Sequence, residues 1–231
     1  MRINKFISSN SKYSRRKADE LIKSGSISIN GRVVKKLGTK INPEKDIVKI
    51  GNKKIKSNSD KVYFALNKPK NYITTRKDEL DRKTVMSLLP KIKNLKPVGR
   101  LDKDTEGLLL LTNDGEFINR HTHPAFKCQK EYFAKIKGEL KSEEKDKLEK
   151  GILLENKKTT PAKIKILKIG EKETDLKITM SEGRKRQIRK MFAYFDHPVK
   201  YLKRIKIGKI HLGPLKKGSY RKLSNSEINA Y

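Results

Sequence analysis

Four consecutive leucines, Leu108 to Leu111, stand between a charge-dense polar segment and a turn signal. The polar segment runs from Gly99 to Gly107, and Asn113-Asp114-Gly115 follows the leucines. A short, wholly apolar run bounded by turn residues is typical of a buried sheet strand, although a short buried helix fits as well. In either case the polar segment borders the core, where rigid elements can hold functional side chains. A solvated loop beside a core element is the plainer interpretation of this segment.

The chain is strongly positive. Its 231 residues include 58 Lys and Arg against 26 Asp and Glu, which gives a formal net charge of +32. Such an excess favours a polyanionic partner, because every phosphate that a protein neutralises releases counterions. A merely soluble, lysine-rich surface is the alternative.

The sequence gives no sign of a membrane partner. No apolar run approaches the roughly 20 residues that a membrane-spanning helix needs, and the first residues lack the apolar stretch of a signal peptide. The single cysteine, Cys128, excludes an intramolecular disulfide and is typical of a reducing compartment. We therefore expect a cytoplasmic protein.

Residues 1–56 are expected to form a small module. Ser14 can cap a helix from Arg15 to Ile22 that Gly25 ends. Asn30-Gly31 between alternating runs is a strong hairpin signal, because both turn residues must take a positive φ. A second pair of strands is expected at 47–50 and 54–55. The polar residues 57–61 then form a linker to a larger domain at 62–231.

The larger domain mixes short strands with a few helices. Strands are expected at 62–66, 133–136, 163–167 and 176–180. A helix is expected from Ser142 to Lys150, capped by Ser142 and closed by Gly151. The apolar face of another helix is predicted from the spacing of Ile188, Met191, Phe192 and Phe195. Because strands and helices come in irregular order, the fold class is α+β rather than a repeating βαβ arrangement.

Several motifs resemble, in the same order, those of RsuA-type pseudouridine synthases, which modify ribosomal RNA. The central one is Gly99-Arg100-Leu101-Asp102 with Thr105-Glu106-Gly107-Leu108. The others are Phe64–Pro69, Lys130-Glu131-Tyr132 and Glu182–Met191. The first fifty or so residues, through Ser14–Arg16 and Ile27–Gly31, are similar to the RNA-binding module named after ribosomal small-subunit protein four. The resemblance covers nearly the whole chain.

The resemblance implies an α+β protein in which a small α/β RNA-binding module precedes a mixed, mainly antiparallel sheet with flanking helices. It implies an isomerase without a cofactor, acting on ribosomal RNA or a pre-ribosomal particle, and we expect a monomer. One departure concerns Asn71, which stands where the family usually has glycine. Because asparagine tolerates a positive φ better than most residues, we expect the turn to survive.

Three catalytic residues follow from the resemblance, and Asp102 is the essential one. Uracil must leave its ribose carbon, rotate and reattach through a ring carbon, and a carboxylate can assist by covalent addition or by taking a proton from the sugar. Either role needs an ionised carboxylate in a largely closed pocket, so an opposite charge must lie nearby. The family supplies it through the position of Arg189. Tyr132 would stack on the target uracil, with core packing as its ordinary alternative.

Further basic residues are candidates for RNA contacts. In the small module these are Arg15, Arg16 and Lys17, and in the larger domain they are Arg100, Arg184, Arg186 and Lys190. In related enzymes the arginine at the position of Arg100 helps to displace the target base; phosphate binding or an ion pair with Asp104 is the alternative. A solvated basic face is the alternative for the others. Asp104 and Glu106 are expected to be loop-capping or solvated carboxylates.

No metal site is expected. His121, His123 and Cys128 follow one another closely, but their spacing matches no common zinc pattern. Two functions then compete: an rRNA pseudouridine synthase, and an RNA-binding assembly factor that kept the scaffold without its chemistry. The enzyme is favoured because a pure binder has no need for Asp102, Tyr132 and Arg189 together. Weak similarity over 116–162 favours large-subunit over small-subunit ribosomal RNA as substrate.

Overall fold

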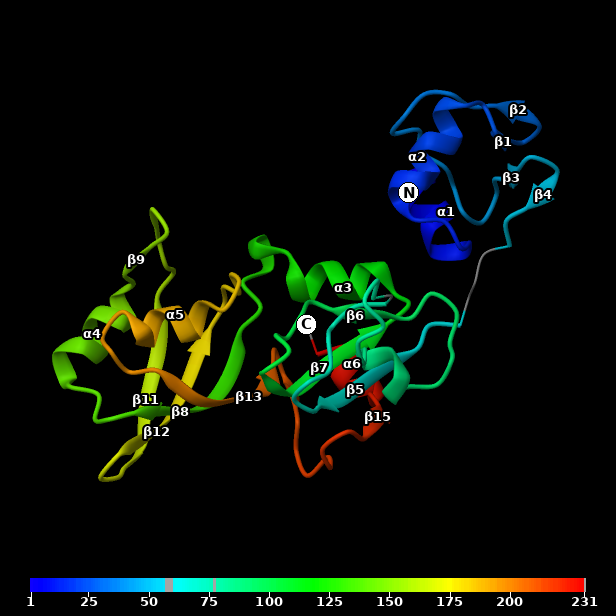
Figure 1. The fold of residues 1–231 in the computed structure, drawn as a ribbon. Coiled ribbons are helices and arrows are strands. Elements are labelled where there is room, and N and C mark those ends of the chain that lie inside the picture. The colour runs from blue at the N-terminus through cyan, green and yellow to red at the C-terminus, as the bar shows by residue number, and fades with distance from the viewer. Residues whose placement is uncertain (57–59, 77, 231) are drawn as a thin grey trace. The chain divides into compact units, whose positions relative to one another are not determined.

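The computed structural model describes residues 1–56, 60–76 and 78–230 (Figure 1). The described chain divides into two compact units. The first contains Met1–Val62 with the short segments Ile92–Leu95 and Asn113–Gly115, and the second contains the rest. Of the linker expected at 57–61, residues 57–59 lie outside the described residues.

The first unit combines two helices with a small antiparallel sheet. The helices are α1 (Ile3–Asn10) and α2 (Arg15–Lys23). The sheet has the order β2 (Arg32–Val33), β1 (Ile27–Ile29), β3 (Val48–Ile50), β4 (Lys53–Lys54). Its core consists of aliphatic side chains and one aromatic ring: Ile3, Phe6, Ile7, Ala18, Ile22, Ile27, Ile41, Val48 and Ile55.

Local sequence signals place most of these elements correctly. The Ser14 hydroxyl accepts a hydrogen bond of 3.1 Å from the backbone N–H of Lys17, so it caps α2 as predicted. Asn30 and Gly31 have φ values of 51° and 85°, as the predicted hairpin requires. Helix α1 was not predicted: no capping side chain precedes it, although Ile3, Phe6 and Ile7 follow the helical spacing i, i+3, i+4.

The second unit is built on a large mixed sheet, antiparallel except where β7 and β13 run parallel. Its main path within the described chain has the order β11-β12-β8-β13-β7-β5-β15, and β14 and β6 extend from β13 and β7. The strands are β5 (Tyr63–Lys68), β6 (Lys96–Val98), β7 (Glu106–Thr112), β8 (Lys130–Lys137), β11 (Ala162–Ile169), β12 (Glu173–Met180), β13 (Val199–Ile207), β14 (Ile210–His211) and β15 (Tyr220–Lys222). A separate hairpin pairs β9 (Leu153–Leu154) with β10 (Lys157–Lys158).

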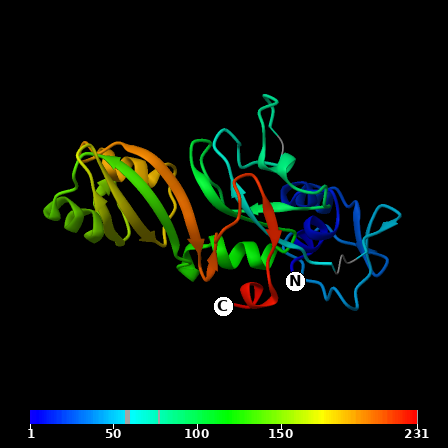
Figure 2. The same ribbon diagram turned by 90° about the horizontal axis from the view of Figure 1, so that it is seen from below.

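Helices flank this sheet (Figure 2). They are α3 (Gly115–Thr122), α4 (Ser142–Lys150), α5 (Gln187–Ala193) and α6 (Asn225–Ile228), with 3-10 turns at Val85–Leu88 and Pro124–Phe126. Helix α4 contacts β11, and α5 contacts β13. The predicted α+β class, with a small module and a larger, mainly antiparallel sheet, is confirmed.

Two details of the helix predictions are wrong. Ser142 is the first helical residue of α4 rather than its cap; the capping position is Lys141, whose N–H donates to the Glu144 carboxylate at 3.0 Å. Helix α5 ends at Ala193, so Phe195 lies in the following turn and is only half-buried. In both cases the observed end of the helix lies one or two residues from the position that the local sequence pattern predicts.

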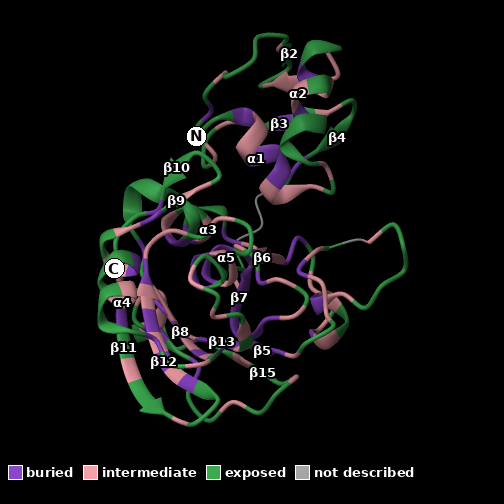
Figure 3. Ribbon diagram, turned by 60° about the vertical axis from the view of Figure 1, so that its left-hand side comes forward, coloured by how far each residue is buried: buried purple, intermediate pink, exposed green. Residues whose placement is uncertain are grey.

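The four leucines form the middle of strand β7, which is buried along its whole length (Figure 3). Strand β5 pairs with one edge of β7, and β13 and β6 pair with the other. Its alternating side chains are all buried, so both faces of β7 are covered. Leu108 and Leu110 pack with Phe117 of α3 in the main core. Complete burial of both faces explains why the run is apolar instead of alternating.

Gly107 allows β7 and β13 to approach closely. It has a φ of 102°, and a Cβ atom there would lie 2.2 Å from the carbonyl oxygen of Arg204. A side chain at this position would therefore force the two parallel strands apart. No helix within the described residues is long and apolar enough to cross a membrane.

Candidate active site

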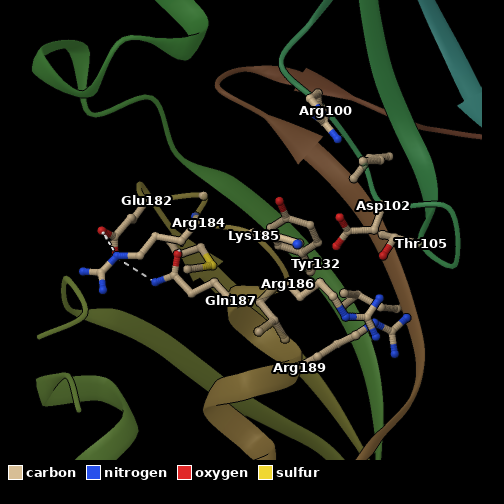
Figure 4. Close-up of a pocket in the computed structure, with 15 residues that line it drawn as sticks. Arg100, Asp102, Thr105, Tyr132, Glu182, Arg184, Lys185, Arg186, Gln187 and Arg189 are labelled. Carbon is tan, nitrogen blue, oxygen red and sulfur yellow. Dashed lines mark hydrogen bonds and ion pairs between the residues drawn. The ribbon is translucent and has the colours of Figure 1, made fainter. Parts of the chain in front are cut away.

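A pocket of about 360 Å³ in the second unit brings together residues from distant parts of the sequence (Figure 4). It lies where the loop before β7 meets β8 and the segment that leads into α5. The predicted residues that line it are Arg100, Asp102, Tyr132, Arg184, Arg186 and Arg189. Lys190 is not among the lining residues, and its ammonium group is paired with Glu155. Arg15, Arg16 and Lys17 belong to the first unit, are exposed, and Lys17 pairs with Glu20.

The loop that carries Asp102 is fixed by a buried lysine. Lys68, at the end of β5, is completely buried, and its ammonium group donates to the carbonyl oxygens of Pro69 at 3.0 Å, Asp102 at 3.0 Å and Thr105 at 2.8 Å. Burial lowers the pKa of Lys68 to about 8, against the opposing effect of the nearby carboxylates. A charged ammonium in this place is tolerated because carbonyl oxygens surround it.

The segment after Lys68 adds further contacts to the same loop. The hydroxyl of Thr74 donates to the carbonyl of Leu101 at 2.8 Å and faces the N–H of Leu101 at 3.3 Å. The N–H of Asn71 donates to the carbonyl of Lys103 at 2.8 Å. Asn71 has a φ of 69°, so asparagine does keep the turn that was expected there. Residues 68–74 thus hold the backbone of the loop on both sides of Asp102.

Lys68 and Thr74 were not singled out from the sequence. A signal for Lys68 existed: a lysine that closes the apolar strand Phe64–Leu66 cannot be buried unless acceptors surround its ammonium group. No local pattern indicates that three of these acceptors are main-chain carbonyls 34 to 37 residues further along the chain.

The side chain of Asp102 is left available. It is half-buried, and its carboxylate has no hydrogen-bond or ion-pair partner among the described residues. Figure 4 shows it directed toward the ring of Tyr132, which projects from β8 and is 8% exposed. The pocket therefore offers an unpaired carboxylate opposite a largely buried aromatic ring, with arginines around both.

The arginine from α5 reaches a different carboxylate from the one expected. The Nε atom of Arg189 lies 3.1 Å from Oδ2 of Asp104, and its Nη2 donates to the carbonyl of Asp104 at 3.2 Å. Arg186 also pairs with the Asp104 carboxylate, at 3.0 Å. Burial lowers the pKa of Arg189, and Asp104 opposes this more strongly than Asp102 does. Arg189 thus stabilises the loop through Asp104, and Asp102 feels its charge from further away.

Asp104 and Glu106, the two acidic neighbours of Asp102, were expected to cap the loop or to be solvated, and the structure shows otherwise. Asp104 forms the ion pairs just described, and Arg100 is not its partner. Glu106 is buried and accepts hydrogen bonds from the Tyr201 hydroxyl and from Lys217, both at 2.9 Å. Burial raises the pKa of Glu106, but these two bonds outweigh it and the net pKa is lowered. Burial and Glu106 together raise the pKa of Tyr201 to about 12.

The guanidinium group of Arg184 forms hydrogen bonds within the protein. Its Nε donates to Glu182 at 2.7 Å, and its Nη atoms donate to the carbonyls of Lys157 and Lys158 at 2.9 and 2.5 Å. These bonds attach the hairpin β9–β10 to the rim of the pocket. Gln187 joins the same network by donating to Glu182 at 2.7 Å.

His121 is a buried residue of α3 and packs in the protein interior. It is buried against Phe117, with ring centroids 3.9 Å apart, and burial lowers its pKa to about 4. Across residues 1–56, 60–76 and 78–230, no three His, Cys, Asp or Glu side chains gather where they could hold a metal ion.

Comparison with known proteins shows which protein family has this fold and this pocket. The family model described as RNA pseudouridylate synthase matches residues 62–194, more than half of the chain and the whole of the pocket except Leu202. The chain belongs to the RNA pseudouridylate synthase family. A second model, the S4 domain, matches residues 1–47. The expected resemblance is thereby confirmed for both parts.

Relatives cover nearly the whole length of this pseudouridine synthase. It is 45% identical to an RNA pseudouridine synthase of Aquifex aeolicus, over 99% of this chain and 92% of the relative. It is 42% identical to ribosomal large subunit pseudouridine synthase B of Bacillus subtilis, over 98% and 93%. Ribosomal small subunit pseudouridine synthase A of Escherichia coli is 35% identical, over 99% and 98%.

A solved structure agrees with the fold. A crystal structure of a pseudouridylate synthase superimposes with a TM-score of 0.72 and 34% sequence identity, covering 99% of this chain and 98% of the other. Like the rest of its family, the chain is an isomerase that acts on RNA.

Proposed function

We propose that the chain converts a uridine of large-subunit ribosomal RNA into pseudouridine, with Asp102 as the catalytic carboxylate and without a cofactor. The observation that carries this proposal is the unpaired Asp102 carboxylate, directed at Tyr132 inside the pocket (Figure 4). A carboxylate that acts as a nucleophile or a base needs a free lone pair, whereas the oxygens of a structural aspartate normally all accept hydrogen bonds. The neighbouring Asp104 and Glu106 are bonded in this way, whereas no described residue bonds to the Asp102 carboxylate.

Tyr132 is proposed to stack on the target uracil. Its ring lines the pocket, although the residue is only 8% exposed, and it stands opposite Asp102. An aromatic face at this place can hold a base that has left its helix. Arg189 is proposed to act through Asp104, keeping the loop in position and the local potential positive enough for an ionised Asp102.

The charges on the pocket rim are proposed to hold the RNA backbone. Arg100 and Arg186 are exposed at the pocket, and Lys190 lies on the following helix. Arg184 adds positive charge while its bonds hold the hairpin β9–β10. In the other unit, the exposed first turn of α2 offers Arg15, Arg16 and Lys17. We propose residues 1–56 as an RNA-binding module and 62–231 as the catalytic domain.

The choice of ribosomal subunit rests on the relatives. The chain is 42% identical to the large-subunit synthase of Bacillus subtilis and 35% identical to the small-subunit synthase of Escherichia coli, over nearly equal lengths. This difference favours large-subunit ribosomal RNA. We further propose that the protein works as a monomer in the cytoplasm, where ribosomal RNA is assembled.

The test is to incubate the purified protein with separate transcripts of large-subunit and small-subunit ribosomal RNA, each labelled with tritium at C5 of uracil. Tritium release from the large-subunit transcript alone is expected, followed by mapping of the modified uridine. Release only from the small-subunit transcript would overturn the choice of subunit. Binding of RNA without any release from transcripts or pre-ribosomal particles would favour the assembly factor instead.

A further inference from the structure

A second cavity adjoins the pocket of Asp102 and Tyr132. Its volume is about 830 Å³, and it shares five lining residues with the first pocket: Arg100, Tyr132, Glu182, Gly183 and Arg184. Many of its other lining residues are cationic: Lys127, Lys130, Lys157, Lys158 and Arg204. Glu182 also lines it but is already paired with Arg184 at 2.7 Å. The cavity therefore has a positive lining next to the place where a target base would stack.

The deepest cation in this cavity is incompletely satisfied. Arg204 lies on β13 and is only 4% exposed. Its Nε donates to the carbonyl of Leu108 at 2.8 Å, which fixes the plane of the guanidinium group. Its Nη2 atom is buried and has no hydrogen-bond partner within the described part of the chain. A buried charged donor without an acceptor is rare in native proteins, because it loses its hydration without compensation.

A second cation stands on the same face of the sheet. Arg204 is directly opposite Tyr132 in the pairing of β13 with β8, and Lys130 is two residues before Tyr132. Side chains two residues apart on a strand point to the same face. Lys130 donates to the carbonyl of Ser181 at 3.2 Å, and burial, reinforced by the charge of Arg204, lowers its pKa. Two cations thus flank the tyrosine, with no carboxylate bound to either among the described residues.

We propose that Arg204, together with Lys130, binds a backbone phosphate of the RNA strand beside the target uridine. A phosphate oxygen would accept a hydrogen bond from Nη2 of Arg204 and would relieve the repulsion between the two cations. Because both flank Tyr132, the phosphate must belong to a nucleotide close to the stacked base. The pair would therefore set the register of the strand, while Asp102 and Tyr132 deal with the base itself. This inference rests on the proposed function, since it takes RNA as the substrate.

The test uses short RNA oligonucleotides that contain the mapped target uridine. Each linkage around the uridine is replaced in turn by an uncharged methylphosphonate, and dissociation constants are measured for the wild type and for Arg204→Met. For the wild type, one linkage near the target is expected to weaken binding about tenfold. Arg204→Met should weaken binding of unmodified RNA by a similar factor and should lose no further affinity when that linkage is neutral.

Lys127→Met is the matched control, since it removes one exposed positive charge from the rim of the same cavity. The loss of affinity in Lys127→Met should add to the loss caused by the neutral linkage, because an exposed, solvent-screened charge does not depend on one phosphate. If circular dichroism shows that Arg204→Met is unfolded, Lys130→Met takes its place and should show the same lack of additivity. The inference is overturned if every linkage affects the folded variant as strongly as it affects the wild type.

A measurement without RNA separates this inference from the proposed function. Inorganic phosphate, compared with chloride at equal ionic strength, should raise the Tm of the wild type more than that of Arg204→Met. If phosphate acts this way and yet no linkage in the RNA matters, the cavity is a site for free phosphate and the RNA assignment is wrong. If the wild type releases no tritium from any ribosomal RNA, the proposed function fails, whatever the phosphate measurement shows.

Discussion

The Nζ atom of Lys68 lies 3.0 Å from the carbonyl oxygen of Asp102 and 2.8 Å from that of Thr105. One buried ammonium group thus holds both ends of the turn that presents the Asp102 carboxylate. With the carbonyls of Pro69 at 3.0 Å and Lys103 at 3.4 Å, its three N–H donors face four acceptors. The main chain of Asp102 is fixed by these bonds, which leaves its side chain free for the substrate.

Activity should fall as the pH rises through about 8, the lowered pKa of Lys68. The neutral amine has only two N–H donors, so one more of the surrounding carbonyls is left without a hydrogen bond and the loop loosens. The unfolded chain keeps this proton up to about pH 10.5. Between the two values the unfolded state holds more protons, so Lys68 makes the folded state more stable with rising pH.

Single-turnover rates and thermal unfolding, measured together from pH 6.5 to 9.5, check this prediction in the wild type. The rate should fall over the window in which the contribution of Lys68 to stability grows. A rate that stays constant through pH 9 would show that the third donor is unnecessary. Lys68→Met, which removes all donors and leaves buried carbonyls unpaired, should destabilise the fold by about 1–3 kcal/mol.

Asp102→Asn should abolish isomerisation and leave RNA affinity nearly unchanged. The amide has almost the same shape, but it can neither add to the substrate nor take a proton. Tritium release and RNA binding are measured on the same transcript. Asp104→Asn is the comparison: it weakens the ion pairs to Arg186 and Arg189 and should reduce the rate only partly. Substantial turnover by Asp102→Asn would refute the assignment.

Substitutions of Tyr132 separate stacking from core packing. If the ring stacks on uracil, Tyr132→Phe keeps the affinity for the target, and Tyr132→Ala loses about 1–3 kcal/mol, the range for a base stacked on an aromatic ring. Phe133→Ala on the same strand is the control, because Phe133 faces the other side of the sheet, where it contacts Tyr201. Full binding and activity in Tyr132→Ala would identify the ring as ordinary packing.

Arg189→Ala and Arg186→Ala should behave differently although both residues pair with Asp104. Arg189 is mostly buried and also donates to the carbonyl of Val199 at 2.9 Å, whereas Arg186 is exposed. Loss of Arg189 should lower kcat sharply, because Asp104 and the loop before β7 lose their inner anchor. Loss of Arg186 should mainly raise KM for RNA, since an exposed pair contributes little to stability. Equal effects on kcat would contradict this division of roles.

The double variant Arg15→Ala/Arg16→Ala should weaken RNA binding and leave the chemical step unchanged. If each arginine neutralises one phosphate, the slope of log Kd against log salt should fall by about 0.7–0.9 per residue. Lys53→Ala/Lys54→Ala removes the same charge from β4 and serves as control, with a smaller change in slope expected. An unchanged slope in the first variant would show that the two arginines are merely solvated.

Local signals in the sequence determined much of this protein. Ser14 and Asn30-Gly31 fixed a helix start and a hairpin, because capping and positive φ depend on only a few neighbouring residues. The apolar run at Leu108–Leu111 indicated a buried element before any fold was known. Residue identities in the motif around Asp102 carried the resemblance to pseudouridine synthases, which the comparisons confirmed.

Tertiary structure alone decided how the site is held. Arg189 pairs with Asp104 instead of Asp102, Lys68 binds the loop, and Arg204 keeps a buried donor beside Tyr132 that no described residue accepts. All three depend on contacts between residues 34 to 96 positions apart in the sequence. Ion pairs and hydrogen bonds of this kind depend on distances of a few tenths of an ångström. Sequence patterns specify which elements form and which face is apolar, but the packing of β5, β7, β8 and β13 against one another sets those distances.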